Sequence, residues 1–163
     1  MRVSKLDFIR EQGYPATSPD DDLYSAAMLQ PRIIGVVTVI GVLLQSGWLF
    51  TALGGVLLWS ALAPTHNPFD ALYNVAIARP RSLARLPAAP APRRFAMALA
   101  GTMALVMGVA LLARIPVVAW PLEVMFVLAV AAIVLTNRCA GAALYHALHR
   151  ATSPSSTPSA ASR

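Results

Sequence analysis

The sequence is poor in charged residues, aromatic residues and cysteine, and each shortage excludes a class of protein. Charged residues make up 12% and aromatic residues 7% of the 163 residues, while 57% are hydrophobic. So little charge cannot cover an ordinary soluble domain, in which about a quarter of the residues are charged. The one cysteine, Cys139, excludes an intramolecular disulfide. The composition therefore predicts a single membrane domain with a mostly aliphatic surface.

Charged residues are almost absent from two long stretches. None lies between Arg32 and Asp70, and the range 95–137 contains only Arg114 and Glu123. Runs of about 18 or more apolar residues are typical of membrane-spanning helices. The sequence therefore predicts an all-α fold, an integral membrane helical bundle.

The first apolar stretch is too long for one upright helix. As a single helix, residues 33–63 would be about 46 Å long, against a hydrocarbon core of about 30 Å. The polar and flexible segment 45–48 interrupts this stretch near its middle. We therefore expect two short helices over about 31–45 and 48–63, with one steeply tilted helix as the alternative.

An arginine- and proline-rich loop, residues 64–94, follows these helices. Asn67 and Pro68 predict the start of a short helix that runs to about residue 78. Four prolines between residues 80 and 92 then exclude a regular helix there.

The second apolar stretch predicts two further spans, over 95–113 and 121–137, the second with a helical extension to residue 150. The bundle then has four transmembrane helices as two hairpins, or three if the first stretch is one helix. Small residues recur at every fourth position of the third span, which lets another backbone approach closely. This predicted helix-packing face consists of Ala96, Ala100, Ala104 and Gly108.

Both ends of the sequence are polar. Residues 1–30 predict a cytoplasmic head with a short interfacial helix that starts near Ser18 and Pro19, and the alternative is an ordered segment that only leads into the membrane. No signal peptide is recognised there. Residues 151–163 have the composition of a disordered tail.

The distribution of charge predicts the topology. The net charge is +6, and with four spans every lysine and arginine except Arg114 lies on one side of the membrane. The positive-inside rule therefore favours four spans with both termini cytoplasmic. Because the arginines lie beside membrane segments, nucleic acid is not an expected partner.

A small number of polar residues are candidates for function. Glu123 is the one acid in an apolar stretch, where such residues are often functional. Its predicted place in the first helical turn after Pro121 also suits a structural carboxylate, with Arg114 as the simplest salt-bridge partner. Gln45 and Ser46 are expected to form a turn.

The C-terminal helix offers a second set of candidates. Cys139, His146 and His149 are spaced by seven and three residues, which places them roughly on one helical face. Such a group could bind a metal, or His146 or His149 could ligate a haem or a chlorophyll-type pigment. No fourth ligand lies nearby in the sequence, so interfacial histidines are the competing interpretation and no cofactor is required.

The arginines of the loop are expected to contact anionic lipid head groups or an acidic partner surface. They are Arg79, Arg81, Arg85, Arg93 and Arg94. The sequence contains no glycine-rich phosphate loop and no nucleophile–base pair, so an enzyme acting alone is not expected.

Three short motifs in the second half of the sequence form a recognisable combination. They are Leu72-Tyr73 with Arg79-Pro80, then Pro92-Arg93-Arg94-Phe95-Ala96, and finally Cys139-Ala140-Gly141-Ala142-Ala143-Leu144-Tyr145. Over about residues 33–150 the sequence resembles an uncharacterised bacterial family of small four-helix integral membrane proteins. This resemblance implies four spans and a location in the bacterial inner membrane.

The same family typically ends with a Cys-x-Gly-Cys motif, which implies thiol-redox or metal chemistry. Here the first cysteine corresponds to Cys139, and the second is replaced by Ala142. A cysteine pair can cycle between dithiol and disulfide, whereas one cysteine can form only mixed disulfides.

These observations favour a non-catalytic accessory or assembly subunit of a larger membrane complex, respiratory or photosynthetic. Its expected partners are other integral membrane subunits and anionic lipids. The alternative is a thiol- or metal-linked redox membrane protein that acts through Cys139. A small transporter is a third hypothesis, for which only Gln45 and Ser46 provide polar groups near the middle of a span.

Overall fold

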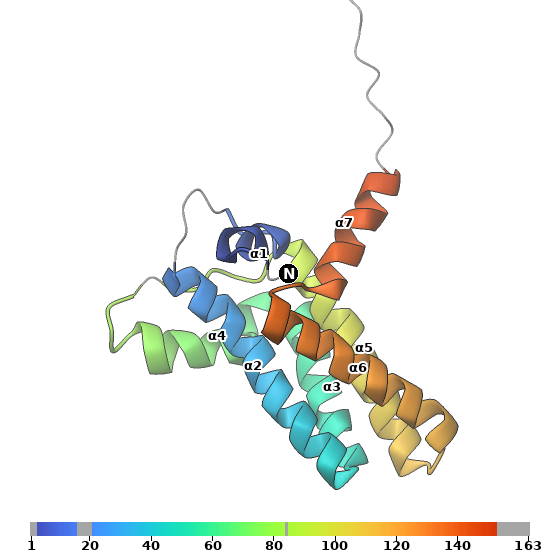
Figure 1. Cartoon of the computed structure of the whole chain (residues 1–163). Helices are drawn as coiled ribbons and strands as arrows, with labels where there is room; N and C mark the ends of the chain where they lie inside the picture. The colour runs from blue at the N-terminus through green and yellow to red at the C-terminus, as the bar shows by residue number, and fades with distance from the viewer. Residues whose placement is uncertain (1–2, 16–20, 84, 153–163) are drawn as a thin grey trace, which may run out of the picture.

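The computed structural model describes residues 3–15, 21–83 and 85–152. Every regular element in these ranges is a helix, so the predicted all-helical class is confirmed. The long helices lie side by side in a bundle (Figure 1) and are α2 (Asp21–Leu44), α3 (Gly47–Leu62), α5 (Ala91–Leu112) and α6 (Pro116–Thr136). By length and composition α2, α5 and α6 can each cross a membrane, whereas α3, with 16 residues, is a shorter apolar helix. The chain is therefore a helical membrane protein.

The short elements gather at one end of the bundle, which we call the head end (Figure 1). They are α1 (Lys5–Glu11), a 3₁₀ turn (Pro64–His66), α4 (Pro68–Tyr73), which continues as a π-helical segment (Asn74–Ala78), and α7 (Ala140–Thr152). The α2–α3 and α5–α6 turns lie at the opposite end, the turn end. The described parts nearest the two termini therefore share the head end.

Helix α1 was not predicted from the sequence. This helix begins after Ser4, whose hydroxyl accepts a hydrogen bond of 3.1 Å from the backbone N–H of Asp7. Its residues Phe8 and Ile9 are fully buried against α2, where the Phe8 ring packs edge-on against Tyr24. The polar head is therefore folded onto the bundle.

Helix α2 differs from the prediction at its start. It runs without a break from Asp21 through Pro31, so the separate interfacial helix predicted before residue 31 is wrong; the predicted cap at residues 18–19 lies outside the described residues. A proline inside a helix removes one backbone hydrogen bond and costs roughly 3 kcal/mol. Buried side chains on both sides of Pro31, Met28 before it and Ile34 after it, offset this cost.

The first apolar stretch is divided as expected. α2 ends at Leu44, Gln45 adopts a left-handed backbone conformation (φ 45°), and Ser46 caps α3 by accepting a hydrogen bond from the Leu49 N–H at 3.3 Å. Within this structure the alternative of one tilted helix over 33–63 is therefore wrong.

Helices α3 and α5 pack closely through two pairs of glycines, which we call the glycine seam. Gly47 lies against Gly108, and Gly54 lies against Gly101. A Cβ atom at Gly54 would lie 2.7 Å from the Leu105 nitrogen, well inside van der Waals contact. The glycines are spaced by seven residues on both helices, so the two antiparallel backbones meet at both positions.

The boundaries of the second hairpin differ from the prediction. α5 begins at Ala91 because Pro92 fits its first turn, and α6 begins at Pro116 and continues through Pro121. α6 does not pass residue 137, since Asn137 adopts a left-handed conformation (φ 59°) and ends it. The predicted helix from 121 to 150 is therefore wrong and is replaced by α6 and a separate α7.

Candidate functional site

A buried ion pair lies at the head end of the bundle. The guanidinium of Arg93, on α5, is 2.8 Å from a carboxylate oxygen of Asp70, on α4, and both residues are buried. The same guanidinium donates to Gln30 Oε1 on α2 at 2.7 Å and to the hydroxyl of Tyr14, after α1. One arginine therefore connects four segments of the chain, and the prediction that Arg93 contacts lipid or a partner is wrong.

Asp70 is positioned by the start of its own helix. Asn67 caps α4 by accepting a hydrogen bond from the Phe69 N–H at 3.1 Å, and its amide donates to Asp70 at 2.9 Å. Burial raises the pKa of Asp70, while the charge of Arg93 and the hydrogen bonds from Arg93 and Asn67 lower it. The charges of Asp70 and Arg93 thus neutralise each other, so neither residue is available as a free acid or a free cation.

A lateral cavity of about 570 Å³ lies beside this pair, between α2, α5, α6 and the start of α7. Its walls are apolar, and its polar end is formed by Gln12, Gln30, Arg93 and Cys139. All four of these residues are less than a tenth exposed. Gln12 and Gln30 were not predicted as site residues, because no local sequence pattern indicates which distant helix a glutamine faces.

Cys139 lies in the junction between α6 and α7 and is buried. Burial raises the pKa of its thiol; the backbone of Ala142 and the nearby Gln12 side chain lower it by less. The thiol is therefore protonated at neutral pH, and a protonated thiol is a poor nucleophile and metal ligand.

The two histidines are engaged separately from Cys139. His146 Nε2 lies 3.0 Å from the backbone oxygen of Glu11, and His149 stacks on Tyr145 with ring centroids 3.9 Å apart. Within residues 3–15, 21–83 and 85–152, no group of three or more His, Cys, Asp or Glu side chains is placed to hold a metal. The structure thus does not bring Cys139, His146 and His149 together as a ligand set.

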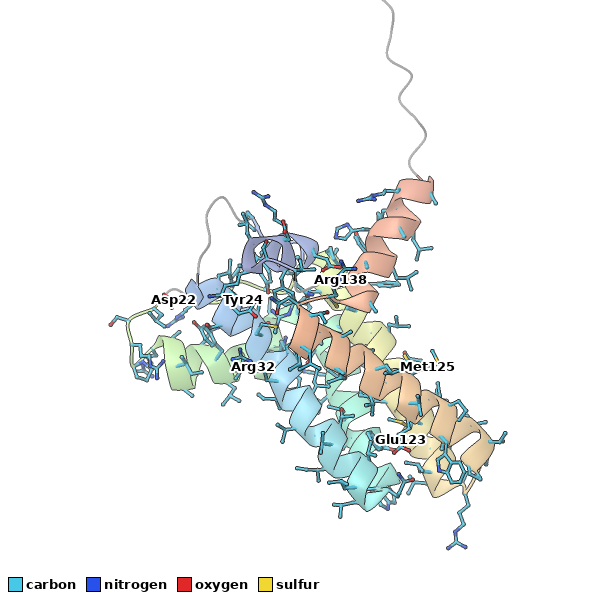
Figure 2. All side chains as sticks on the ribbon, in the orientation of Figure 1. Asp22, Tyr24, Arg32, Glu123, Met125 and Arg138 are labelled. Atoms are coloured by element: carbon cyan, nitrogen blue, oxygen red, sulfur yellow. The ribbon has the colours of Figure 1, made fainter. Side chains whose placement is uncertain are left out.

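Glu123 lies near the turn end of the bundle, where it points between α6 and α2 (Figure 2). It is 8% exposed and accepts a hydrogen bond of 3.0 Å from Gln45 Nε2. Arg114 is exposed and, among the described residues, forms no ion pair with Glu123, so the predicted salt bridge is wrong. Because α6 begins at Pro116, Glu123 also lies beyond the first turn where it was predicted.

The four residues of the predicted packing face have different surroundings: α3, α7 and the lateral cavity. Ala104 and Gly108 face α3, as part of a seam to which Gly101 also belongs. A Cβ atom on Gly141 would lie 2.7 Å from Ala96, so Ala96 packs against α7, and Ala100 lines the lateral cavity.

The loop arginines other than Arg93 are exposed. Arg94 donates to the backbone oxygen of Ala61 at 2.9 Å, which ties the start of α5 to the end of α3. Arg79, Arg81 and Arg85 follow the π-helical segment and form a basic edge at the head end.

Comparison with known protein families assigns the chain to one family. A family model described as a domain of unknown function (DUF4395) matches residues 26–150, which include all four long helices from within α2 onward. The chain belongs to this family. No curated protein and no solved structure matches the chain.

The DUF4395 match ends within α7, so it includes the junction that holds Cys139. In this DUF4395 member, Ala142 is fully buried in the first turn of α7, directly after that junction. Its backbone N–H interacts with the Cys139 sulfur. Residue 142 therefore contributes packing and a backbone contact here rather than a second thiol.

Proposed function

We propose that this chain is a non-catalytic subunit of a larger membrane complex in the bacterial inner membrane. In this proposal α3 is a fourth span, and both termini and the basic edge lie on the cytoplasmic side. The positive-inside distribution of arginines supports this orientation.

The observation that carries the proposal is the exposed face of α7. This helix lies outside the three candidate spans and projects from the head end (Figure 1). Leu144 is 43% and Leu148 is 49% exposed. Small residues that are also exposed continue the same face, at Ala140, Ala143, Ala147 and Ala151. A contiguous apolar face beyond the membrane spans favours a site of protein contact, and the small residues allow close approach of another helix.

The state of the polar side chains supports a non-catalytic role. Arg93 and Asp70 neutralise one another, Glu123 is bonded to Gln45, and Cys139 is buried as a thiol. A redox reaction at Cys139 needs the thiolate, which burial disfavours. Replacement of Cys139 with Ser therefore separates the two hypotheses, because only the redox alternative predicts loss of function.

A matched pair of substitutions on α7 tests the proposal. Leu148→Gln places an amide on the apolar face, and His149→Gln places the same amide at the neighbouring position, on a different side of the helix. We expect the wild-type chain and the His149→Gln variant to migrate as a large complex after gentle detergent extraction from native membranes. The Leu148→Gln variant is expected to migrate as the free subunit. Migration of the wild-type chain as a lone monomer in native membranes would contradict the proposed role.

A further inference from the structure

The lateral cavity has the position and lining of a lipid site. Its volume of about 570 Å³ lies within the range of roughly 300–1,000 Å³ that is usual for ligand pockets. Exposed Leu99, Met125 and Leu128 belong to its lining and lie on candidate membrane spans. The cavity therefore opens sideways toward hydrocarbon, and its occupant arrives from the membrane.

The inner wall of the cavity suits a flexible apolar chain. Met97, Met103 and Phe126 contribute to it, and the exposed Met125 continues it to the opening. Methionine side chains are unbranched and polarizable, and they adapt to irregular apolar partners. An alkyl or alkenyl chain can therefore lie between α5 and α6 without a rigid, shape-specific pocket.

The polar end of the cavity contains an unused hydrogen-bond donor. Gln12 is 4% exposed, and within the part of the chain that the structure describes its Nε2 is the only buried side-chain nitrogen or oxygen without a hydrogen-bond partner. The neighbouring Cys139 sulfur interacts with the Gln12 side chain, but sulfur is a weak acceptor and this contact does not have the geometry of a hydrogen bond to Nε2. A buried amide without an acceptor is costly unless a ligand supplies one.

The charge at this end restricts the head group of the ligand. Among the described residues that line the cavity Arg93 is the one cation, and it is paired with Asp70 and also donates to Gln30 Oε1. The four residues of the polar end are each less than a tenth exposed. A phosphate or a carboxylate would have to lose its water there without a counter-charge, which is strongly unfavourable. The acceptor must therefore be small and uncharged.

We propose that the lateral cavity binds a neutral lipid with a small carbonyl head, such as a long-chain ester, whose carbonyl oxygen accepts a hydrogen bond from Gln12 Nε2. The chain of the lipid lies along the methionines between α5 and α6. Ala140 and Leu144 belong both to the lining of the cavity and to the exposed face of α7 that carries the proposed subunit role, whereas Gln12 and the three methionines belong to the cavity alone.

Photolabelling of the full-length protein in phosphatidylcholine nanodiscs tests the site. The probe is methyl oleate with a diazirine in its chain, and the matched probes are the diazirine hydrocarbon without the ester and the diazirine free fatty acid. Intact-protein mass spectrometry measures the labelled fraction, and peptide mapping gives the position. We expect the ester to label cavity residues of α5 and α6 more strongly than either matched probe.

Three variants separate the cavity from the lipid background. Ala129→Phe fills the cavity and is expected to abolish specific labelling, whereas Ala52→Phe, on an exposed position of α3, leaves it unchanged. Gln12→Leu keeps the volume of the side chain but removes the donor. Loss of one hydrogen bond is expected to weaken ester labelling by about fivefold and to leave hydrocarbon labelling as it was.

The melting temperature of Gln12→Leu distinguishes the proposed role from a purely structural one, because a structural role for Gln12 predicts a decrease. Without added lipid, Gln12→Leu is expected to melt at the same temperature as the wild type or higher, because it removes an unsatisfied amide. A lower melting temperature would show that Gln12 already has a partner in the protein and would overturn the proposal. Equal labelling by the ester and the hydrocarbon, or stronger labelling by the free acid, would overturn it as well.

Discussion

The ion pair between Arg93 and Asp70 predicts a large loss of stability when one partner is removed alone. Asp70→Leu keeps a side chain of similar size but leaves the Arg93 guanidinium buried, with only the neutral Gln30 and Tyr14 as partners. Breaking a buried pair in this way costs about 3–5 kcal/mol, because an uncompensated charge remains. For a chain of this size about 2–4 °C of melting temperature correspond to each kcal/mol, so we expect a decrease of about 6–20 °C.

Tryptophan fluorescence during a thermal ramp in detergent measures this decrease at one fixed scan rate. The control is the double variant Asp70→Leu/Arg93→Met, which removes both charges and should recover most of the stability, since apolar replacement of a whole pair is often neutral. Recovery is expected to be incomplete because Tyr14 and Gln30 lose their shared donor. Asp70→Leu that melts with the wild type, or a double variant that melts below the single one, would refute the assigned role of the pair.

Three further predictions concern separate parts of the molecule. Gly54→Ala is expected to destabilise the bundle by about 1–3 kcal/mol through overpacking. Gly55→Ala is expected to be neutral or stabilising, because no atom beyond its own turn of helix lies within 4 Å of the added carbon, and thermal melting compares the two variants. Alkylation of Cys139 by N-ethylmaleimide should be slower than that of a free thiol at pH 8 and should keep rising above pH 9, because burial raises its pKa; a rate plateau near pH 7 would contradict this. Trypsin added to inside-out membrane vesicles should cleave within residues 79–85, and cleavage in right-side-out vesicles instead would reverse the proposed topology.

The sequence predicted those features of the fold that depend on local signals. The absence of charge over two long stretches indicated the membrane helices, and the polar residues Gln45 and Ser46 marked the turn between α2 and α3. Asn67 was identified as a cap, and its side chain accepts the expected backbone hydrogen bond. Each of these features involves residues within a few positions of one another.

Features that depend on distant partners were missed or wrong. Pro31 was expected to lie at a helix boundary, but tertiary packing keeps the helix continuous there. Asn137 was expected inside a helix, yet its side chain accepts a hydrogen bond from Tyr24 and donates to the backbone oxygen of Val3, which holds it in a left-handed conformation. Arg93 was grouped with exposed arginines because nothing beside it in the sequence indicates that Asp70 and Gln30 lie within reach.

The partners of Arg93 also imply an order of assembly during synthesis. Tyr14, Gln30 and Asp70 all precede Arg93 in the chain, and Asp70 precedes it by 23 residues. Since synthesis proceeds from the N-terminus, the Asp70 carboxylate has no counter-ion from this cluster until Arg93 has been made. When α5 packs into the bundle, the Arg93 guanidinium joins the half of the protein that is synthesised first to the half that is synthesised later.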